Sequence, residues 1–372
     1  MMMMAVRPCY QLLVFSILIL FASIYLPLVV SIFQKVWFYK IFDNQTCPYC
    51  YGDNLCDDIY NGHFNLSINN LLDVGQFIST KNVYKGLYKQ QRVFVKKLAD
   101  SWELSEFDKS EKKDVSNTNI LKYLNQVTPL ANFKSCDKST SEHFLNDLTE
   151  NWTLEQIWTI IHINIEPLII KIFNKSSGYA VPNILGYCGR SILQEDSGEP
   201  LNVFTKVSWI KRAYLAVQLL KSAVDFTFKH PKYRIYLTDM SSDNVAVQKT
   251  TMKLTFIDLE NAVLDLKEPR RLIHYSNNFQ NEYAFSQDKI CDSSISDHNI
   301  FSVCKLFLSK NAPWPMMKNG LLHNPPISIW VKHRQLFKSI KYCVISKKRF
   351  YFSKKILISL QHILHLYKGV LN

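Results

Sequence analysis

The fold of this chain is decided by the stretch Thr238-Asp239-Met240-Ser241-Ser242-Asp243-Asn244 and by Ile257-Asp258-Leu259-Glu260, which follows it. Asp239 and Asn244 stand five residues apart in a polar turn that is flanked by apolar, strand-like runs. Asp258 directly follows another such run. Carboxylate and carbonyl oxygens are the ligands that Mg²⁺ prefers, and a carboxylate can also orient a hydroxyl group. The two stretches therefore predict one polar site at the ends of strands.

The same spacing is found in the catalytic loop of protein kinases, where an Asp and an Asn are separated by four residues. In that arrangement a second Asp, at a strand end, binds metal, and a Lys at the end of an earlier strand contacts the nucleotide phosphates. Asp258 occupies the first of these positions, and Lys96, which ends the run 92–96, occupies the second. Their order predicts phosphoryl transfer with ATP and Mg²⁺ or Mn²⁺. Carboxylates that merely end turns and strands are the simpler alternative.

The surrounding pattern predicts an α+β protein of two lobes, with a divergent protein-kinase-like fold, in which strands come first and helices follow. The chain divides into a leader (1–36), a Cys-containing segment (37–70), an N-lobe (71–200) and a C-lobe (201–372). A polar stretch at 100–150 is typical of an insertion or a long surface connection. Helices are expected at 153–173, interrupted at Pro167, and at 208–228. Asp297 opens a further helix, where kinases place a buried Asp that braces the catalytic loop.

Residues 10–33 are apolar or small throughout, carry no charge and are long enough to span a bilayer. Such a leader is either a cleaved signal peptide, with a weak cleavage site at Ala22-Ser23, or a signal-anchor helix that stays in the membrane. The length of the run slightly favours the anchor. With either alternative, the rest of the chain enters the secretory pathway.

Eight cysteines lie beyond the leader, an even number that predicts up to four disulfides in an oxidising compartment, with the pairing left open. They are Cys47, Cys50, Cys56, Cys136, Cys188, Cys291, Cys304 and Cys343. A zinc site is the alternative for the first three, with His63 as the fourth ligand. Sequons for N-glycosylation, which suit a lumenal protein, occur at Asn44, Asn65, Asn151 and Asn174.

The net charge of +13 is concentrated in the C-terminal part of the chain. After Asp297 there is no Asp or Glu, while Lys and Arg number 13. This basic region, Lys305 to Lys368, is able to meet an anionic lipid, a sulfated glycan or an acidic substrate. A solvated, lysine-rich surface over apolar helices is the plainer interpretation. We do not expect nucleic acid to bind, because no nucleic-acid recognition motif accompanies the charge.

Several motifs between Cys47 and the C-terminus are specific enough to compare with known families. They are Cys47-Pro-Tyr-Cys50-Tyr-Gly52 with Cys56, Lys81-Asn82-Val83-Tyr84, Asn164-Ile165-Glu166-Pro167-Leu168, Leu185-Gly186-Tyr187-Cys188-Gly189-Arg190, Asp239 to Asn244, Asp258-Leu259-Glu260-Asn261, Asp297-His298-Asn299 with Cys304, and Gly320-Leu321-Leu322-His323-Asn324-Pro325-Pro326. In these motifs the chain resembles the divergent protein kinase domain 2 group, also called the deleted-in-autism proteins. The resemblance implies a signal-bearing, kinase-like protein of the Golgi lumen or membrane, or of the extracellular space.

The resemblance also implies a role for each residue of the site. Lys96 would hold the nucleotide phosphates, and Asp239 would orient or deprotonate the acceptor hydroxyl. Asn244 and Asp258 would bind the metal. Glu166 is expected to pair with Lys96, although the adjacent Pro167 is awkward inside a helix, so that Glu155 is the alternative.

Several residues depart from the kinase pattern. Gly75 is the only glycine in the expected phosphate loop, and Leu237-Thr238 replaces the His-Arg that precedes the catalytic Asp. Leu259-Glu260 replaces the Phe-Gly that follows the metal-binding Asp. Two functions are therefore open: a phosphotransferase that acts on a protein or sugar hydroxyl, and a catalytically inactive, secreted signalling ligand or scaffold that binds a cell-surface receptor.

Overall fold

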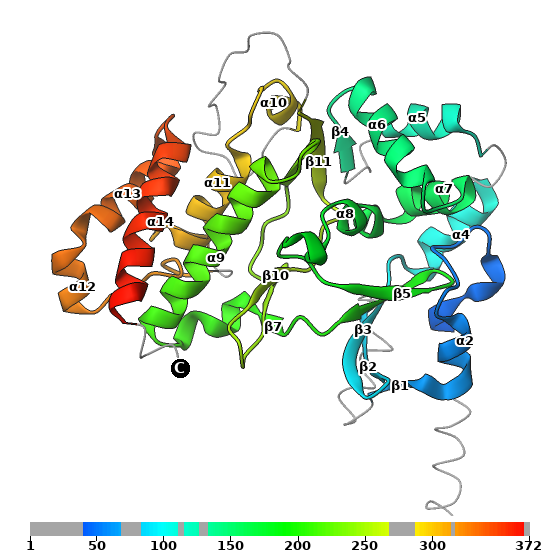
Figure 1. The fold of residues 1–372 in the computed structure, drawn as a ribbon, viewed down its shortest axis with the longest axis horizontal. Helices are drawn as coiled ribbons and strands as arrows, with labels where there is room; N and C mark the ends of the chain where they lie inside the picture. Colours follow the sequence, from blue (N-terminus) through cyan, green and yellow to red (C-terminus); the bar gives the residue numbers. More distant parts are fainter. Residues whose placement is uncertain are drawn as a thin grey trace, which may run out of the picture.

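The computed structural model describes residues 40–67, 83–110, 115–125, 133–267, 287–313 and 317–367. The leader at 10–33 and the phosphate-loop residue Gly75 lie outside these ranges. Within them the chain forms strands and helices in two lobes (Figure 1), and the mixed α+β, kinase-like fold is as predicted.

Strand β3 lies at the centre of the first lobe, in a five-stranded antiparallel sheet with the order β1-β2-β3-β6-β5. The strands are β1 (Phe64–Leu66), β2 (Val83–Tyr88), β3 (Gln91–Lys97), β5 (Ile184–Cys188) and β6 (Ser191–Glu195). Successive side chains of a strand point to opposite faces of the sheet. Val93 and Val95 therefore pack with Leu193 in an apolar cluster, whereas Phe94 and Lys96 line a cleft on the other face.

The Cys-containing segment covers the sheet face that points away from the cleft. It includes η1 (Asn44–Thr46), α2 (Cys56–Asp58) and η2 (Ile59–His63). Ile41 and Phe42 join the same apolar cluster as Val95. The segment approaches the β5–β6 turn closely at Gly189, where φ is +58° and a Cβ atom would lie 1.7 Å from the carbonyl oxygen of Phe42. Only glycine allows this approach.

The stretch at 100–150 is more regular than its composition predicts. It contains α4 (Ser101–Ser110), α5 (Asn117–Asn125), β4 (Phe133–Ser135) and α6 (Lys138–Thr149). Phe144 and Leu148 of α6 are fully buried in the main core. The expected surface connection is therefore wrong for this part of the stretch. A few apolar residues at helical spacing bury one side of each helix, and the many polar residues between them hide that pattern.

The apolar stretch at 153–173 forms two helices, α7 (Leu154–Ile163) and α8 (Glu166–Ile172). The break lies just before Pro167, so that the proline falls in the first turn of α8, where it is tolerated, and not inside a helix. Among the described residues no single helix is long and apolar enough to cross a membrane. By length and composition, only α7 together with Glu166–Ser177 passes that test, and these two segments are bent by 114°.

The second lobe is built around α9 (Trp209–Phe228), whose inner face lies in the main apolar core. Two small sheets, β10-β9-β7 and β4-β11-β8, belong to the rest of the chain, and β7 and β9 of the first contribute to the cleft. The remaining elements are η4 (Lys175–Ser177), β7 (Glu199–Pro200), η5 (Leu201–Lys206), β8 (Tyr233–Leu237), β9 (Val245–Val247), β10 (Leu254–Phe256), β11 (Ala262–Leu266), α10 (Gln287–Cys291), α11 (His298–Ser302), η6 (Val303–Leu308), α12 (Ile327–Lys332), α13 (Arg334–Ile345) and α14 (Arg349–Leu366). The polar turn with Asp239 and Asn244 joins β8 to β9, and Asp258 follows β10.

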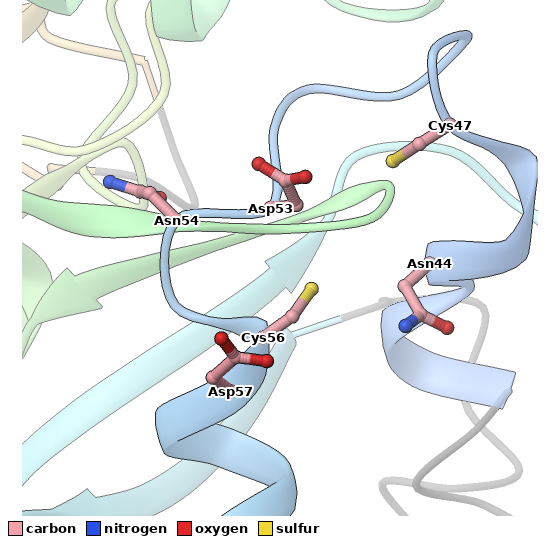
Figure 2. A pocket seen from close by; sticks show the side chains of 6 residues that line it. All are labelled: Asn44, Cys47, Asp53, Asn54, Cys56 and Asp57. Carbon is pink, nitrogen blue, oxygen red and sulfur yellow. The ribbon is translucent and has the colours of Figure 1, made fainter.

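All eight cysteines beyond the leader form disulfides, which confirms the predicted four. The pairs are Cys47–Cys50, Cys56–Cys188, Cys136–Cys291 and Cys304–Cys343. Cys47 and Cys56 line one cavity of about 420 Å³ (Figure 2), but their sulfurs are bonded to other cysteines. His63 contacts Asp58 instead. The structure therefore has disulfides at Cys47, Cys50 and Cys56 instead of the alternative zinc site.

The four sequons differ in accessibility. Asn65 and Asn151 are exposed, while Asn44 is partly buried at the wall of the cavity in Figure 2. The side chain of Asn174 is engaged, because its oxygen accepts from the Ser177 backbone N–H and its amide donates to the Lys171 carbonyl. Asn65 and Asn151 are therefore the two sequon asparagines that are exposed to solvent.

We expect the long-range disulfides to stabilise the chain far more than the Cys47–Cys50 bond. Cys136 and Cys291 are 155 residues apart, and Cys47 and Cys50 only three. Loop-closure entropy gives about 5 kcal/mol for the first and about 2 kcal/mol for the second. Paired Cys→Ala variants of each bond should differ accordingly in the free energy of unfolding, measured in urea. Equal losses would show that loop closure does not govern these bonds.

Candidate functional site

A cavity of about 840 Å³ lies between the two lobes and contains the side chains that the sequence singles out. Lys96, Asn244 and Asp258 all line it, although they come from three separate elements. Apolar walls are supplied by Val83, Phe94 and other residues of the sheet and of β9. Asp239 is exposed beside the cavity and is connected to it through Asn244.

Lys96 is held in the cleft by two contacts. Its Nζ lies 2.5 Å from Oε2 of Glu166, and it also donates to the backbone carbonyl of Ile257 at 3.0 Å. Glu166, and not Glu155, is therefore the partner of Lys96. Pro167 does not prevent this, because α8 begins at Glu166 and the proline falls in its first turn.

The Lys96–Glu166 pair is buried, with a fully buried carboxylate and a lysine side chain that is 16% exposed. Burial disfavours the ammonium form of Lys96, but the carboxylates of Glu166 and Asp258 outweigh this effect, so that its pKa lies above the ordinary value. Gln194 donates from Nε2 to the second carboxylate oxygen of Glu166 at 3.1 Å. The lysine is therefore a fixed positive charge in the cleft.

Asp239 and Asn244 are joined directly. Nδ2 of Asn244 donates to the backbone oxygen and to Oδ2 of Asp239, both at 3.0 Å. The backbone of Asn244 accepts from the Ile257 N–H, which fixes the turn against the strand that leads to Asp258. These bonds engage the side-chain nitrogen of Asn244. Its side-chain oxygen, Oδ1, is an acceptor and is therefore the atom that could bind a metal ion.

Asn164, in the break between α7 and α8, forms a second connection between α8 and the Asp258 loop. Its Oδ1 accepts from the Glu166 backbone N–H at 2.9 Å, and its Nδ2 donates to Glu260. Burial, followed by the charges of Asp258 and Glu166, raises the pKa of Glu260 to about 7. Asn164 appeared in the sequence only as part of a family motif. The sequence signal that could have identified Asn164 is its position as a polar residue at a break in an apolar helical pattern.

Among the described residues, Asp297 forms no hydrogen bond with β8, the strand that precedes the polar turn with Asp239. The carboxylate of Asp297 is buried and accepts from Arg349 of α14 at 3.0 and 3.2 Å. The next two residues contact β8 instead: Nε2 of His298 lies 2.9 Å from the Leu237 carbonyl, and Asn299 accepts from the Leu237 N–H at 3.1 Å. The expected role of Asp297 is corrected to tying the C-terminal helix to α11.

The donor set of the cleft fits a divalent cation that is shared with phosphate groups. Among the described residues no three His, Cys, Asp or Glu side chains are gathered as a self-sufficient metal site. Mg²⁺ is usually held by one or two protein oxygens together with substrate phosphates. Asp258 and Oδ1 of Asn244 are side-chain oxygens of that kind, and Lys96 supplies the charge that a phosphate requires.

Comparisons with known proteins show which proteins this chain resembles. A family model described as the protein-kinase domain of FAM69 matches residues 157–345. "Divergent protein kinase domain 2A" of mouse and of human is 26% identical over 358 aligned positions, covering 82% of this chain and 83% of the relative. "Divergent protein kinase domain 2B" of mouse is 31% identical over 99 positions, which cover 27% of this chain and 22% of that protein. The solved structure of vaccinia related kinase 3 aligns with a TM-score of 0.35 and 10% identity, over 78% of this chain and 84% of that one.

Replacing Asn164 by alanine is expected to destabilise the connection between α8 and the Asp258 loop. Asn164→Ala removes two hydrogen bonds, one of them to a carboxylate, and should lower the free energy of unfolding by about 2 kcal/mol. Asn261→Ala is the matched control, because the Asn261 amide lies 3.5 Å from the same carboxylate. Urea denaturation measures both. Equal losses in the two variants would contradict the role of Asn164.

Stability should depend on the protonation of His298. Burial lowers the pKa of His298 to about 4, against the opposing effect of its bond to Leu237, whereas the unfolded imidazole titrates near its ordinary value of about 6.5. Between these values the unfolded state binds the additional proton. The contribution of His298 to the free energy of unfolding is therefore fully present above pH 6.5. It is lost as the pH falls towards 4, and the loss is on the order of 3 kcal/mol.

Urea denaturation at several pH values between 4 and 7 measures this dependence. His298→Gln should flatten the curve in this range, even if the variant is less stable at every pH. His365→Gln, at an exposed position of α14, is the control and should leave the curve unchanged. A His298→Gln variant with an unchanged slope would assign the dependence to other groups.

Proposed function

Because the chain belongs to the family of protein-kinase domains typified by FAM69, we propose that it is a phosphotransferase that uses ATP with Mg²⁺ or Mn²⁺ and transfers phosphate to a hydroxyl acceptor. The observation that carries the proposal is the convergence of Lys96, Asn244 and Asp258 on one cleft, with Lys96 already fixed by Glu166. Phosphoryl transfer depends mainly on such positioning of charges. The acceptor belongs to a protein or a sugar.

Each residue has a distinct task in this proposal. Lys96 binds the nucleotide phosphates through its ammonium group, and Glu166 keeps that group in place. Asp258 and Oδ1 of Asn244 hold the divalent cation, which neutralises phosphate charge when it is bound. Asp239 lies at the open side of the cleft, where it orients the acceptor hydroxyl and accepts its proton.

We place this activity in the secretory pathway, in the Golgi lumen or at its membrane, or outside the cell. Four disulfides support an oxidising compartment, because thiols are kept reduced in the cytosol. The apolar run at 10–33 supports entry into that pathway. The exposed sequons at Asn65 and Asn151 are compatible with it.

Nucleotide binding by the full chain tests the proposal. ATP should raise the melting temperature in a concentration-dependent manner, and the shift should increase with Mg²⁺ or Mn²⁺. Lys96→Ala should reduce the shift with and without metal, since it removes the phosphate contact. Asp258→Ala should remove only the increase that metal produces.

Asp292→Ala is the matched control, because Asp292 is exposed and does not line the cleft. It should behave as the wild type. A folded chain without any ATP-dependent shift would favour the second function, a secreted kinase-fold ligand or scaffold whose receptor binds without nucleotide. A metal-dependent shift that survives in Asp258→Ala would assign the cation to other residues.

A further inference from the structure

The outer face of α12, α13 and α14 carries an unusual number of exposed apolar side chains. Eight of the 13 large apolar residues that are exposed in the described chain lie between Ile327 and Leu366. They are Ile327, Trp330, Val331, Tyr342, Ile345, Tyr351, Ile358 and Leu366, with exposed fractions from 47% to 82%. The three helices form one edge of the molecule, at the opposite end from α4 and β5 (Figure 1). We call this region the C-terminal face.

Basic side chains share the exposed side of α13 with the apolar ones. Arg334, Lys338, Lys341 and Ile345 are all exposed and follow one another at intervals of three or four residues, so they form one stripe on the helix. The opposite side of α13, with Leu336 and three other residues, is buried. The stripe therefore points away from the core.

Helix α14 presents a second stripe of the same kind. Tyr351, Lys355 and Ile358 are exposed at intervals of four and three residues, and Leu366 continues the stripe at the end of the helix. Both helices bury their inner sides in the main core of the second lobe. The two helices also contact each other, with the rings of Tyr342 and Phe352 stacked, so the stripes lie on neighbouring helices.

Among the residues that the structure describes, no carboxylate forms a salt bridge with Lys338, Lys341 or Lys355. The sequence after Asp297 contains no Asp or Glu. In the part of the chain that the structure describes, the salt bridge of α12–α14 is that between the buried Arg349 and Asp297. Lys338 and Lys341 are exposed, and the exposed Lys355 holds its ammonium 4.5 Å from the centre of the Tyr351 ring, so all three are accessible to an anionic partner.

We propose that the C-terminal face binds a membrane surface with anionic lipid head groups. Apolar and aromatic residues interleaved with lysines are the composition of helices that lie in the membrane interface. Each lysine near such a surface adds to the attraction, and aromatic side chains such as Trp330 prefer the head-group level. The apolar residues distinguish lipid from a sulfated glycan, which would leave Ile327 and Val331 in water.

A second copy of the chain does not fit this face. A two-fold contact places the same patch on both partners, so that Lys338, Lys341 and Lys355 would meet their own copies. Like charges opposed across an interface are costly, and the C-terminal face offers no carboxylate to pair with them.

Amide hydrogen exchange of the full chain on vesicles tests the proposal. One vesicle contains phosphatidylcholine alone, and the other contains in addition about one third phosphatidylserine, which supplies the anionic surface. The apolar run at 10–33 is common to both conditions, so the comparison isolates the C-terminal face. Anionic vesicles should slow the exchange of peptides from α13 and α14, and neutral vesicles should not.

Three variants complete the test. Lys338→Glu, Lys341→Glu and Lys355→Glu together should abolish the protection of α13 and α14. Ile327→Ser, Trp330→Ser and Val331→Ser together should weaken it. Lys171→Glu, Lys249→Glu and Lys253→Glu, at exposed sites on other elements, are the charge-matched control and should leave it unchanged.

Several outcomes would overturn the proposal. They are equal exchange on both vesicles, protection that persists in the charge variant, and protection that is unaffected by the apolar variant. Protection by a heparin oligosaccharide without any by vesicles would assign the face to a glycan. None of these outcomes depends on ATP binding, so failure here is distinct from failure of the proposed phosphotransferase.

Discussion

The buried ion pair between Lys96 and Glu166 is the contact on which the geometry of the cleft depends. Removing two charges from water is costly, and an isolated pair often fails to recover that cost. Here the Gln194 amide and the Ile257 carbonyl add hydrogen bonds to the two ions. The pair therefore connects β3, α8 and the segment before Asp258, and a shift of any of these would leave a buried charge unpaired.

The parts of the site that the sequence predicts are those fixed by local spacing. Asp239 and Asn244 occupy one turn, Lys96 lies near the end of β3, and Asp258 follows β10, so the pattern of apolar residues locates them. The sequence leaves two candidates for the partner of Lys96, Glu166 and Glu155, because the effect of Pro167 depends on where α8 begins. The family resemblance that the motifs indicate is confirmed by the matches to FAM69-type and divergent protein kinase domains.

The parts that the sequence does not predict are contacts between distant segments. Asn164 and Glu260 are 96 residues apart, and Arg349 reaches Asp297 across 52 residues. Side chains of this kind have no periodicity that marks their partner. The same limit explains the error at 100–150: the composition is polar, but α6 packs Phe144 and Leu148 into a core whose other members lie far along the chain.

The disulfide that joins Cys56 of the Cys-containing segment to Cys188 has a consequence for biosynthesis. Cys56 leaves the ribosome 132 residues before its partner Cys188, whereas Cys50 follows Cys47 after three residues. At typical rates of translation the wait for Cys188 lasts roughly ten seconds or more. During that time Cys56 is a thiol next to Cys47, Cys50 and, later, Cys136, each of which is a wrong partner. If the short Cys47–Cys50 loop closes first, two of these three competitors are removed, and the small disulfide then favours correct pairing of the large one.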